Sequence, residues 1–143
     1  MQVMTLPRTI ADFAGLWHIR REIADRRAGQ SGLFTGQATL VPDAKGLIYS
    51  ETGQLSLGDQ PPIAATRRYL WQDLGDGAAI HFEDGRPFHV LPFGAAAPRA
   101  HHDCPPDDYQ VRYDFTAWPD WQAVWTVRGP RKDYTMASHY ARH

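Results

Sequence analysis

The chain has 143 residues, of which 43% are hydrophobic and 12% aromatic, so an intrinsically disordered protein is excluded. The formal net charge is −1 and the basic residues are scattered, which argues against nucleic acid as a partner. Cys104 is the only cysteine, so no intramolecular disulfide forms, and no segment approaches the roughly 20 apolar residues of a membrane span. We therefore expect one domain over residues 1–143, cytoplasmic, without a signal peptide in residues 1–8 and without membrane contact.

The first half of the chain predicts a helical turn followed by strands. Residues 9–13 are predicted as one helical turn, which Gly15 ends. From Trp17 to Ala24 the side chains alternate between two faces, the period of two that is typical of a strand. Further strands are predicted at 33–41, 47–57, 65–74, 78–83 and 88–93, separated by turns that contain Gly, Pro and Asp.

The second half begins with residues 94–108, which carry three prolines, adjacent histidines and the cysteine. We predict an ordered loop here, because strands resume on both sides. Later strands are predicted at 109–115, 121–127 and 134–142. About nine strands with short turns and no βαβ pattern predict an all-β protein: a single antiparallel up-and-down barrel of about 8–10 strands with a short N-terminal helical turn. Closure is favoured because it removes exposed strand edges.

Residues Gly15-Leu16-Trp17, at the start of the first strand and after a helical turn, resemble the Gly-x-Trp signature of the calycin superfamily. The lipocalins and the fatty-acid-binding proteins belong to that group. The resemblance implies a lipocalin-like barrel whose closed end is plugged by Trp17 and covered by a late arginine. Pairing of the last strand with the first places Arg142 near Trp17, where a stacked guanidinium contributes ~0.5–2 kcal/mol. Residues 102–109 and 125–134 are similar to a family of uncharacterised bacterial proteins, which implies no established activity.

The alternation assigns polar as well as aromatic side chains to the barrel interior. The candidate ligand-binding residues are Arg21, Tyr49, Glu51, Arg67, Tyr69, Trp71, Tyr113, Trp125, Ser138 and Tyr140. Buried arginines are costly unless paired, so one hypothesis is an internal Arg–Glu–Tyr network that fills the barrel and leaves no room for a ligand. The hypothesis that we adopt is an aromatic-walled pocket in which Arg21 and Arg67 hold the anionic group of a small amphipathic molecule.

The turn at residues 129–132 lies at the end opposite Trp17, so Arg131 and Lys132 are predicted at the pocket rim. An alternative is a small isomerase, lyase or hydrolase in which His102 and Tyr109 are the catalytic acid and base. A nucleophilic Cys104, activated by His102, is a further enzymatic alternative.

The same region and the C-terminus contain residues that could bind a metal or haem. His102 and Cys104 with Asp107 and Asp108 offer zinc ligands without the usual spacing. The alternative is that His102 and Asp108 hydrogen-bond the loop backbone while Cys104 is a small buried residue. Nitrobindins, which are calycin-like barrels, bind haem through a histidine near the C-terminus, but the alternation points His139 outward. We expect no metal and no cofactor.

The expected partner is thus a small amphipathic or anionic molecule, with neither nucleic acid nor membrane. A homodimer is left open, because Trp118 is a candidate for an outward-facing aromatic residue at an interface.

Overall fold

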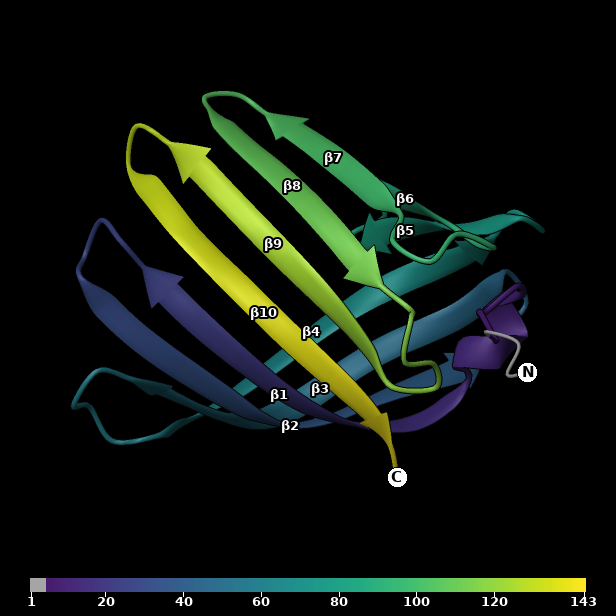
Figure 1. Cartoon of the computed structure of the whole chain (residues 1–143), viewed down its shortest axis with the longest axis horizontal. Coiled ribbons are helices and arrows are strands. Elements are labelled where there is room, and N and C mark those ends of the chain that lie inside the picture. Colours follow the sequence, from purple (N-terminus) through teal and green to yellow (C-terminus); the bar gives the residue numbers. More distant parts are fainter. Residues whose placement is uncertain (1–4) are drawn as a thin grey trace.

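The computed structural model describes residues 5–143, and strands dominate it (Figure 1). The expectation that residues 1–8 contain no signal peptide falls partly outside the described residues, because residues 1–4 are not among them. Within residues 5–143, no helix has the length and apolar character needed to cross a membrane. The elements are a 3₁₀ turn η1 (Ile10–Phe13) and the strands β1 (Gly15–Asp25), β2 (Gln30–Pro42), β3 (Gly46–Leu57), β4 (Ile63–Asp73), β5 (Gly77–Phe82), β6 (Pro87–Pro92), β7 (Arg99–Cys104), β8 (Asp107–Asp114), β9 (Trp121–Gly129) and β10 (Lys132–Arg142).

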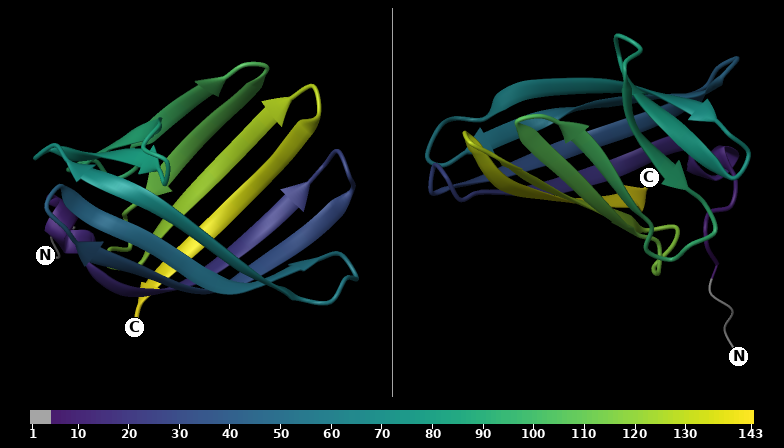
Figure 2. Two further views of the ribbon diagram at one scale, coloured as in Figure 1. Left: turned by 180° about the vertical axis from the view of Figure 1, so that it is seen from behind. Right: turned by 90° about the horizontal axis from the view of Figure 1, so that it is seen from above.

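The ten strands form one antiparallel sheet in the order β6-β5-β4-β3-β2-β1-β10-β9-β8-β7. The sheet curls so that its two edge strands approach each other, which makes a nearly closed barrel (Figures 1 and 2). In the described part of the chain, β6 and β7 share no strand ladder, so this seam is where the barrel stays open. The predicted fold class is confirmed: an all-β, antiparallel up-and-down barrel that follows one short helical turn.

Residues 94–108 depart from the prediction, because they contain the strand β7 and not only a loop. The sequence Arg-Ala-His-His-Asp-Cys has no β-branched or large aromatic residue, so its local propensity gives no strand signal. Its pairing with β8, in which His102 lies opposite Tyr109, stabilises the extended backbone instead. The barrel therefore has ten strands, where the sequence predicted about nine.

The closed end has the arrangement that the Gly-x-Trp resemblance implied. Trp17 is fully buried, and its indole N–H donates to the Phe13 carbonyl at 2.9 Å. The guanidinium of Arg142 lies 3.8 Å from the centre of the Trp17 ring and donates to two backbone carbonyls, one of them that of Ala14 at 2.6 Å. Gly15 has φ 119°, and a Cβ there would lie 3.0 Å from the Arg142 side chain. The predicted place of Arg142 is confirmed.

The apolar core is concentrated at this end of the barrel, beside η1. The ring of Phe13 lies within 5.0–5.7 Å of five other aromatic rings, those of Trp71, Phe93, Phe115, Trp118 and Trp121. Trp118 is half-buried in this cluster, so its prediction as an outward-facing residue was wrong. Polar and aromatic side chains share the remaining interior of the barrel.

Candidate functional site

A cavity of about 1000 Å³ lies inside the barrel. That volume is at the upper end of the range for small-molecule sites. Figure 1 shows the hairpins β1–β2, β3–β4, β7–β8 and β9–β10 at the end of the barrel away from η1, which we call the mouth. The cavity lining includes all ten interior residues predicted from the alternation, namely Arg21, Tyr49, Glu51, Arg67, Tyr69, Trp71, Tyr113, Trp125, Ser138 and Tyr140, together with His102 and Tyr109. Their roles toward a ligand stay predictions.

A buried ion pair crosses the cavity wall between β1 and β3. The Arg21 guanidinium donates to both oxygens of the Glu51 carboxylate, at 2.7 and 3.0 Å, and its Nε donates to the Ser138 hydroxyl at 2.7 Å. Burial alone would raise the pKa of Glu51, but the hydrogen bonds and charge of Arg21 overcome it and lower that pKa. Because the pair is bidentate, the charge of Arg21 is already matched inside the protein.

Two tyrosines extend this pair into the network that one hypothesis predicted. Tyr49 donates to Glu51 at 2.5 Å, and its oxygen lies 2.8 Å from the hydroxyl of Tyr140. Burial raises the pKa of both phenols, that of Tyr140 to about 12, so both stay neutral at ordinary pH. The network is present, yet a large cavity remains beside it. The two hypotheses for the interior are therefore not exclusive.

Stacked aromatic rings form the opposite wall. The Phe88 ring is parallel to that of Trp125, with an interplanar angle of 8° and centroids 4.8 Å apart, and it also stacks on Phe82 at 4.4 Å. Tyr69 continues the stack at 5.6 Å from Phe88. These rings give the cavity an aromatic wall.

His89 is a cavity residue that the sequence reasoning missed. Its Nε2 lies 2.7 Å from the Tyr113 hydroxyl, and its Nδ1 has no hydrogen-bond partner among the described residues. Burial, aided by the nearby His102, lowers the pKa of His89 to about 3, so its ring is neutral. A signal was present in the sequence: His89 and Leu91 are two positions apart in the strand predicted at 88–93, and in the structure both are buried with Val90 exposed between them.

The charged residues of the lining nearly balance. Four arginines and three carboxylates contribute to it. Apart from the Arg21 pair, Glu83 and Asp84 each contact an arginine, at 3.5 and 2.7 Å. The fourth arginine, Arg67, forms no ion pair within residues 5–143, and its guanidinium donates to the Tyr69 hydroxyl at 3.3 Å. The cavity thus carries one unmatched positive charge.

The two predicted rim residues differ in their surroundings. Neither Arg131 nor Lys132 is among the lining residues, and Arg131 is exposed to solvent. Lys132 contacts a lining residue: its ammonium donates to the Tyr109 hydroxyl at 2.8 Å and lies 3.1 Å from the Asp107 carboxylate. These two contacts raise the pKa of Lys132.

The strand β7 divides the polar residues of the 101–108 segment between the two faces of the sheet. His102 and Cys104 line the cavity, so the predicted zinc ligands His102, Cys104 and Asp108 are not brought together. Cys104 is exposed rather than buried, and Asp108 binds the side chains of His101 and Gln110 rather than loop backbone, so both of those expectations were wrong.

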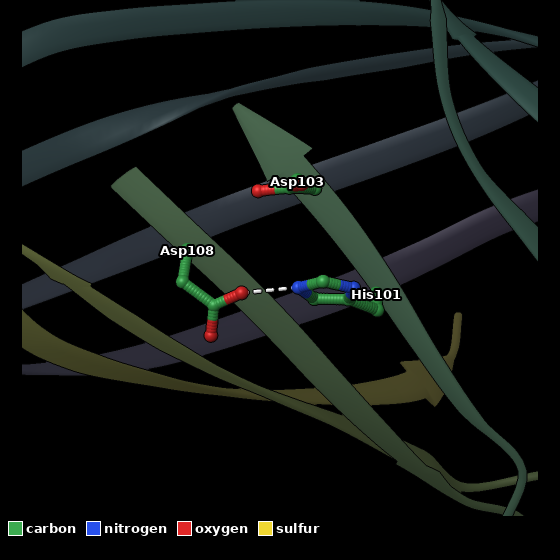
Figure 3. Close-up of side chains that lie close together, drawn as sticks. All are labelled: His101, Asp103 and Asp108. Atoms are coloured by element: carbon green, nitrogen blue, oxygen red, sulfur yellow. Dashed lines mark hydrogen bonds and ion pairs between the residues drawn. The ribbon is translucent and has the colours of Figure 1, made fainter. Parts of the chain in front are cut away.

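A different set of potential metal ligands gathers on the outer face. One ligand atom each from His101, Asp103 and Asp108 lies within 4.8 Å of the others (Figure 3). Hydrogen bonds from His101 and Gln110 lower the pKa of Asp108, so this carboxylate is ionised at neutral pH. His101 and Asp103 are exposed and Asp108 is half-buried, and the His101–Asp108 contact is satisfied without an ion.

The haem hypothesis does not fit the cavity through His139. This residue is exposed on β10, opposite Arg20 of β1, and does not line the cavity, as the alternation predicted. A haem inside the barrel would need another axial ligand.

Fold and site together define a class of protein: a nearly closed antiparallel barrel with a large, aromatic-walled internal cavity. Residues 13–142 match the model of a family of unknown function (DUF6314), and the chain belongs to that family. No curated protein matches the chain.

Two solved structures resemble it. The S-type phycobiliprotein lyase from Guillardia theta superposes with a TM-score of 0.56 at 11% identity, covering 94% of this chain and 90% of that chain. A redesigned β-barrel bound to DFHBI gives a TM-score of 0.43 at 13% identity, covering 95% and 100%. At these identities the likeness to the lyase shows a shared fold alone.

Proposed function

We propose that this protein binds one small, flat, amphipathic molecule with a single anionic group inside its barrel. The observation that carries the proposal is the cavity itself: about 1000 Å³, walled by stacked rings and carrying one unmatched cation, Arg67. Apolar rings of a ligand gain burial against the stack, and its anion gains a partner that the protein does not otherwise use. The calycin-like arrangement of the closed end and the fold shared with the phycobiliprotein lyase are consistent with a barrel that holds a small molecule.

Of the two arginines predicted as anion partners, we assign the role to Arg67. Three N–H groups of Arg21 already donate within the network, and Glu51 cancels its charge. A ligand anion at Arg21 would have to displace the Glu51 carboxylate from these donors and lose its hydration. Arg67 lies opposite Glu51 on the neighbouring strand and reaches the cavity from its exposed side, so its charge is available to a ligand.

Native mass spectrometry of the protein purified from its own host, with an absorption spectrum of the same sample, tests occupancy directly. A small mass that is lost on denaturation is expected, and its formula gives the ligand class. In parallel, anilinonaphthalene sulfonate serves as an anionic aromatic probe in a fluorescence titration. Arg67→Met is expected to weaken its binding by roughly tenfold or more, since hydrogen bonds to charged groups contribute about 1.5–3 kcal/mol. Arg20→Met, on the outer face, is the charge-matched control. A bare native mass together with no probe binding would contradict the proposal.

An acid–base enzyme that uses the same cavity is the second candidate. His102 and Tyr109 both line the cavity on paired strands, with their ring centroids 5.7 Å apart. The two functions differ in their response to His102→Ala. A binding protein keeps most of its affinity for the ligand found by mass spectrometry, whereas an enzyme keeps the affinity and loses conversion of that ligand to product.

A further inference from the structure

The hydrogen bond between Lys132 and Tyr109 fixes which way the phenol proton points. An ammonium group has only donors, so at 2.8 Å it must donate to the Tyr109 oxygen. The Tyr109 hydroxyl therefore has its own proton left to give to another acceptor. Asp107 holds the ammonium from a second side at 3.1 Å, which keeps Lys132 in this position.

Tyr109 and Arg67 line the same cavity. Tyr109 and Tyr134 lie on one rung of the barrel, because both pair with Val127 on the strand between them. Burial and the neighbouring Tyr109 phenol raise the pKa of Tyr134, while the charges of Lys132 and Arg67 act to lower it. The guanidinium of Arg67 and the phenol of Tyr109 thus approach the mouth from β4 and β8, two walls of the cavity.

We infer that a carboxylate of the ligand is held at the mouth between the Arg67 guanidinium and the Tyr109 hydroxyl, and that Lys132 is the positioning residue that orients this hydroxyl. The inference rests on the proposed function and deepens it by naming the anionic group and its partners. A carboxylate has two oxygens that accept in one plane, one for each donor. Lys132 acts through Tyr109, since it does not itself line the cavity.

A pair of matched probes tests this: a biphenyl carboxylate and the corresponding biphenyl carboxamide, each titrated calorimetrically into the full-length protein. The wild type is expected to prefer the carboxylate. Tyr109→Phe and Lys132→Met are each expected to weaken carboxylate binding by roughly tenfold, with carboxamide binding within about twofold of the wild type. The double variant is expected to bind the carboxylate as the single variants do, because the second substitution removes nothing further.

Two more variants separate positioning from bulk charge. Arg128→Met removes one positive charge from an exposed site at the same end of the barrel and is expected to change neither affinity. Lys132→Arg keeps an N–H donor and is expected to restore most of the carboxylate preference. Circular dichroism of every variant confirms that the barrel is intact.

The outcomes distinguish this inference from the proposed function. If the wild type binds neither probe at millimolar concentration, the proposed function fails and the inference fails with it. If the probes bind but Lys132→Met still weakens carboxylate binding tenfold in a Tyr109→Phe background, Lys132 contacts the anion directly and the inference alone is overturned. Equal binding of both probes by the wild type overturns the inference and also the anionic group in the proposed function, because Arg67 alone should favour the carboxylate.

Discussion

The buried histidine of the cavity wall makes the stability of the barrel depend on pH. His89 is 8% exposed, and burial lowers its pKa from 6.5 to about 3. Between these two values the unfolded chain binds a proton that the folded chain does not bind. Stability must therefore fall as the pH falls through this window, and it is complete only above pH 6.5.

The size of the effect follows from the same two values. Each pH unit inside the window costs about 1.4 kcal/mol, so acidification from pH 7.5 to 4.5 removes roughly 3 kcal/mol through His89 alone. That is a large part of the 5–15 kcal/mol that is typical of a folded domain. Glu51, whose pKa is lowered, adds a loss only below its ordinary value near 4.5.

Urea unfolding at pH 7.5 and 4.5, in wild type and in His89→Phe, isolates this contribution. The variant lacks the hydrogen bond to Tyr113 and is expected to be about 1–2 kcal/mol less stable at pH 7.5. On acidification it should lose roughly 3 kcal/mol less than the wild type does, because phenylalanine binds no proton. His139→Phe, at an exposed position, is the control and should follow the wild type. If His89→Phe and the wild type lose the same stability, then His89 is not held neutral by burial and the reasoning is refuted.

Three further substitutions test other parts of the barrel by chemical unfolding. Glu51→Gln leaves the buried Arg21 charge without its partner and should lower the free energy of unfolding by about 3–5 kcal/mol. Adding Arg21→Met should restore most of this loss, and a double variant in which the two losses simply add would contradict the reasoning. Arg142→Ala removes the stack on Trp17 and two hydrogen bonds to backbone carbonyls at and after the turn η1. It should lower the free energy of unfolding by about 1–3 kcal/mol, and an unchanged unfolding midpoint would show that Arg142 does not stabilise the closed end. Gly53→Ala places a Cβ 2.3 Å from a carbonyl oxygen of β2 and should destabilise the barrel more than Glu51→Gln or Arg142→Ala does. A variant as stable as the wild type would exclude this close approach of β2 and β3.

The interior of the barrel could be predicted because its strands are long and regular. Period-two alternation fixes which residues of a strand share a face, and a single buried anchor such as Trp17 then assigns that face to the inside. This reasoning placed Arg21, Glu51 and Tyr140 in the lining, although they lie on different strands and up to 119 positions apart in the sequence. It also placed Arg142 over Trp17, because antiparallel pairing brings the end of one strand to the start of the other.

Which side chains contact one another inside the barrel could not be predicted in the same way. Alternation gives the side of the sheet to which a residue belongs, but not which residues on that side meet across the barrel. The bidentate contact of Arg21 with Glu51, which cancels a predicted ligand-binding charge, depends on the register between β1, β2 and β3. The strand β7 was missed for a related reason: its residues have weak strand propensity, and its pairing with β8 determines its conformation.

The residues that stabilise the barrel and the residues that we propose to bind a ligand lie in different parts of its interior. The closed end is held by the stack around Phe13 and by Arg142, and the middle by the ion pair of Arg21 with Glu51. At the mouth, Arg67 forms no ion pair within residues 5–143, and the Tyr109 hydroxyl accepts from Lys132 and keeps its own proton, so removing either side chain disturbs fewer contacts than breaking the ion pair does. Substitutions at the mouth should therefore change affinity with little effect on unfolding, while those at the ion pair should do the reverse. If the proposed function is correct, residues at the mouth can change the ligand preference of this cavity without loss of the fold.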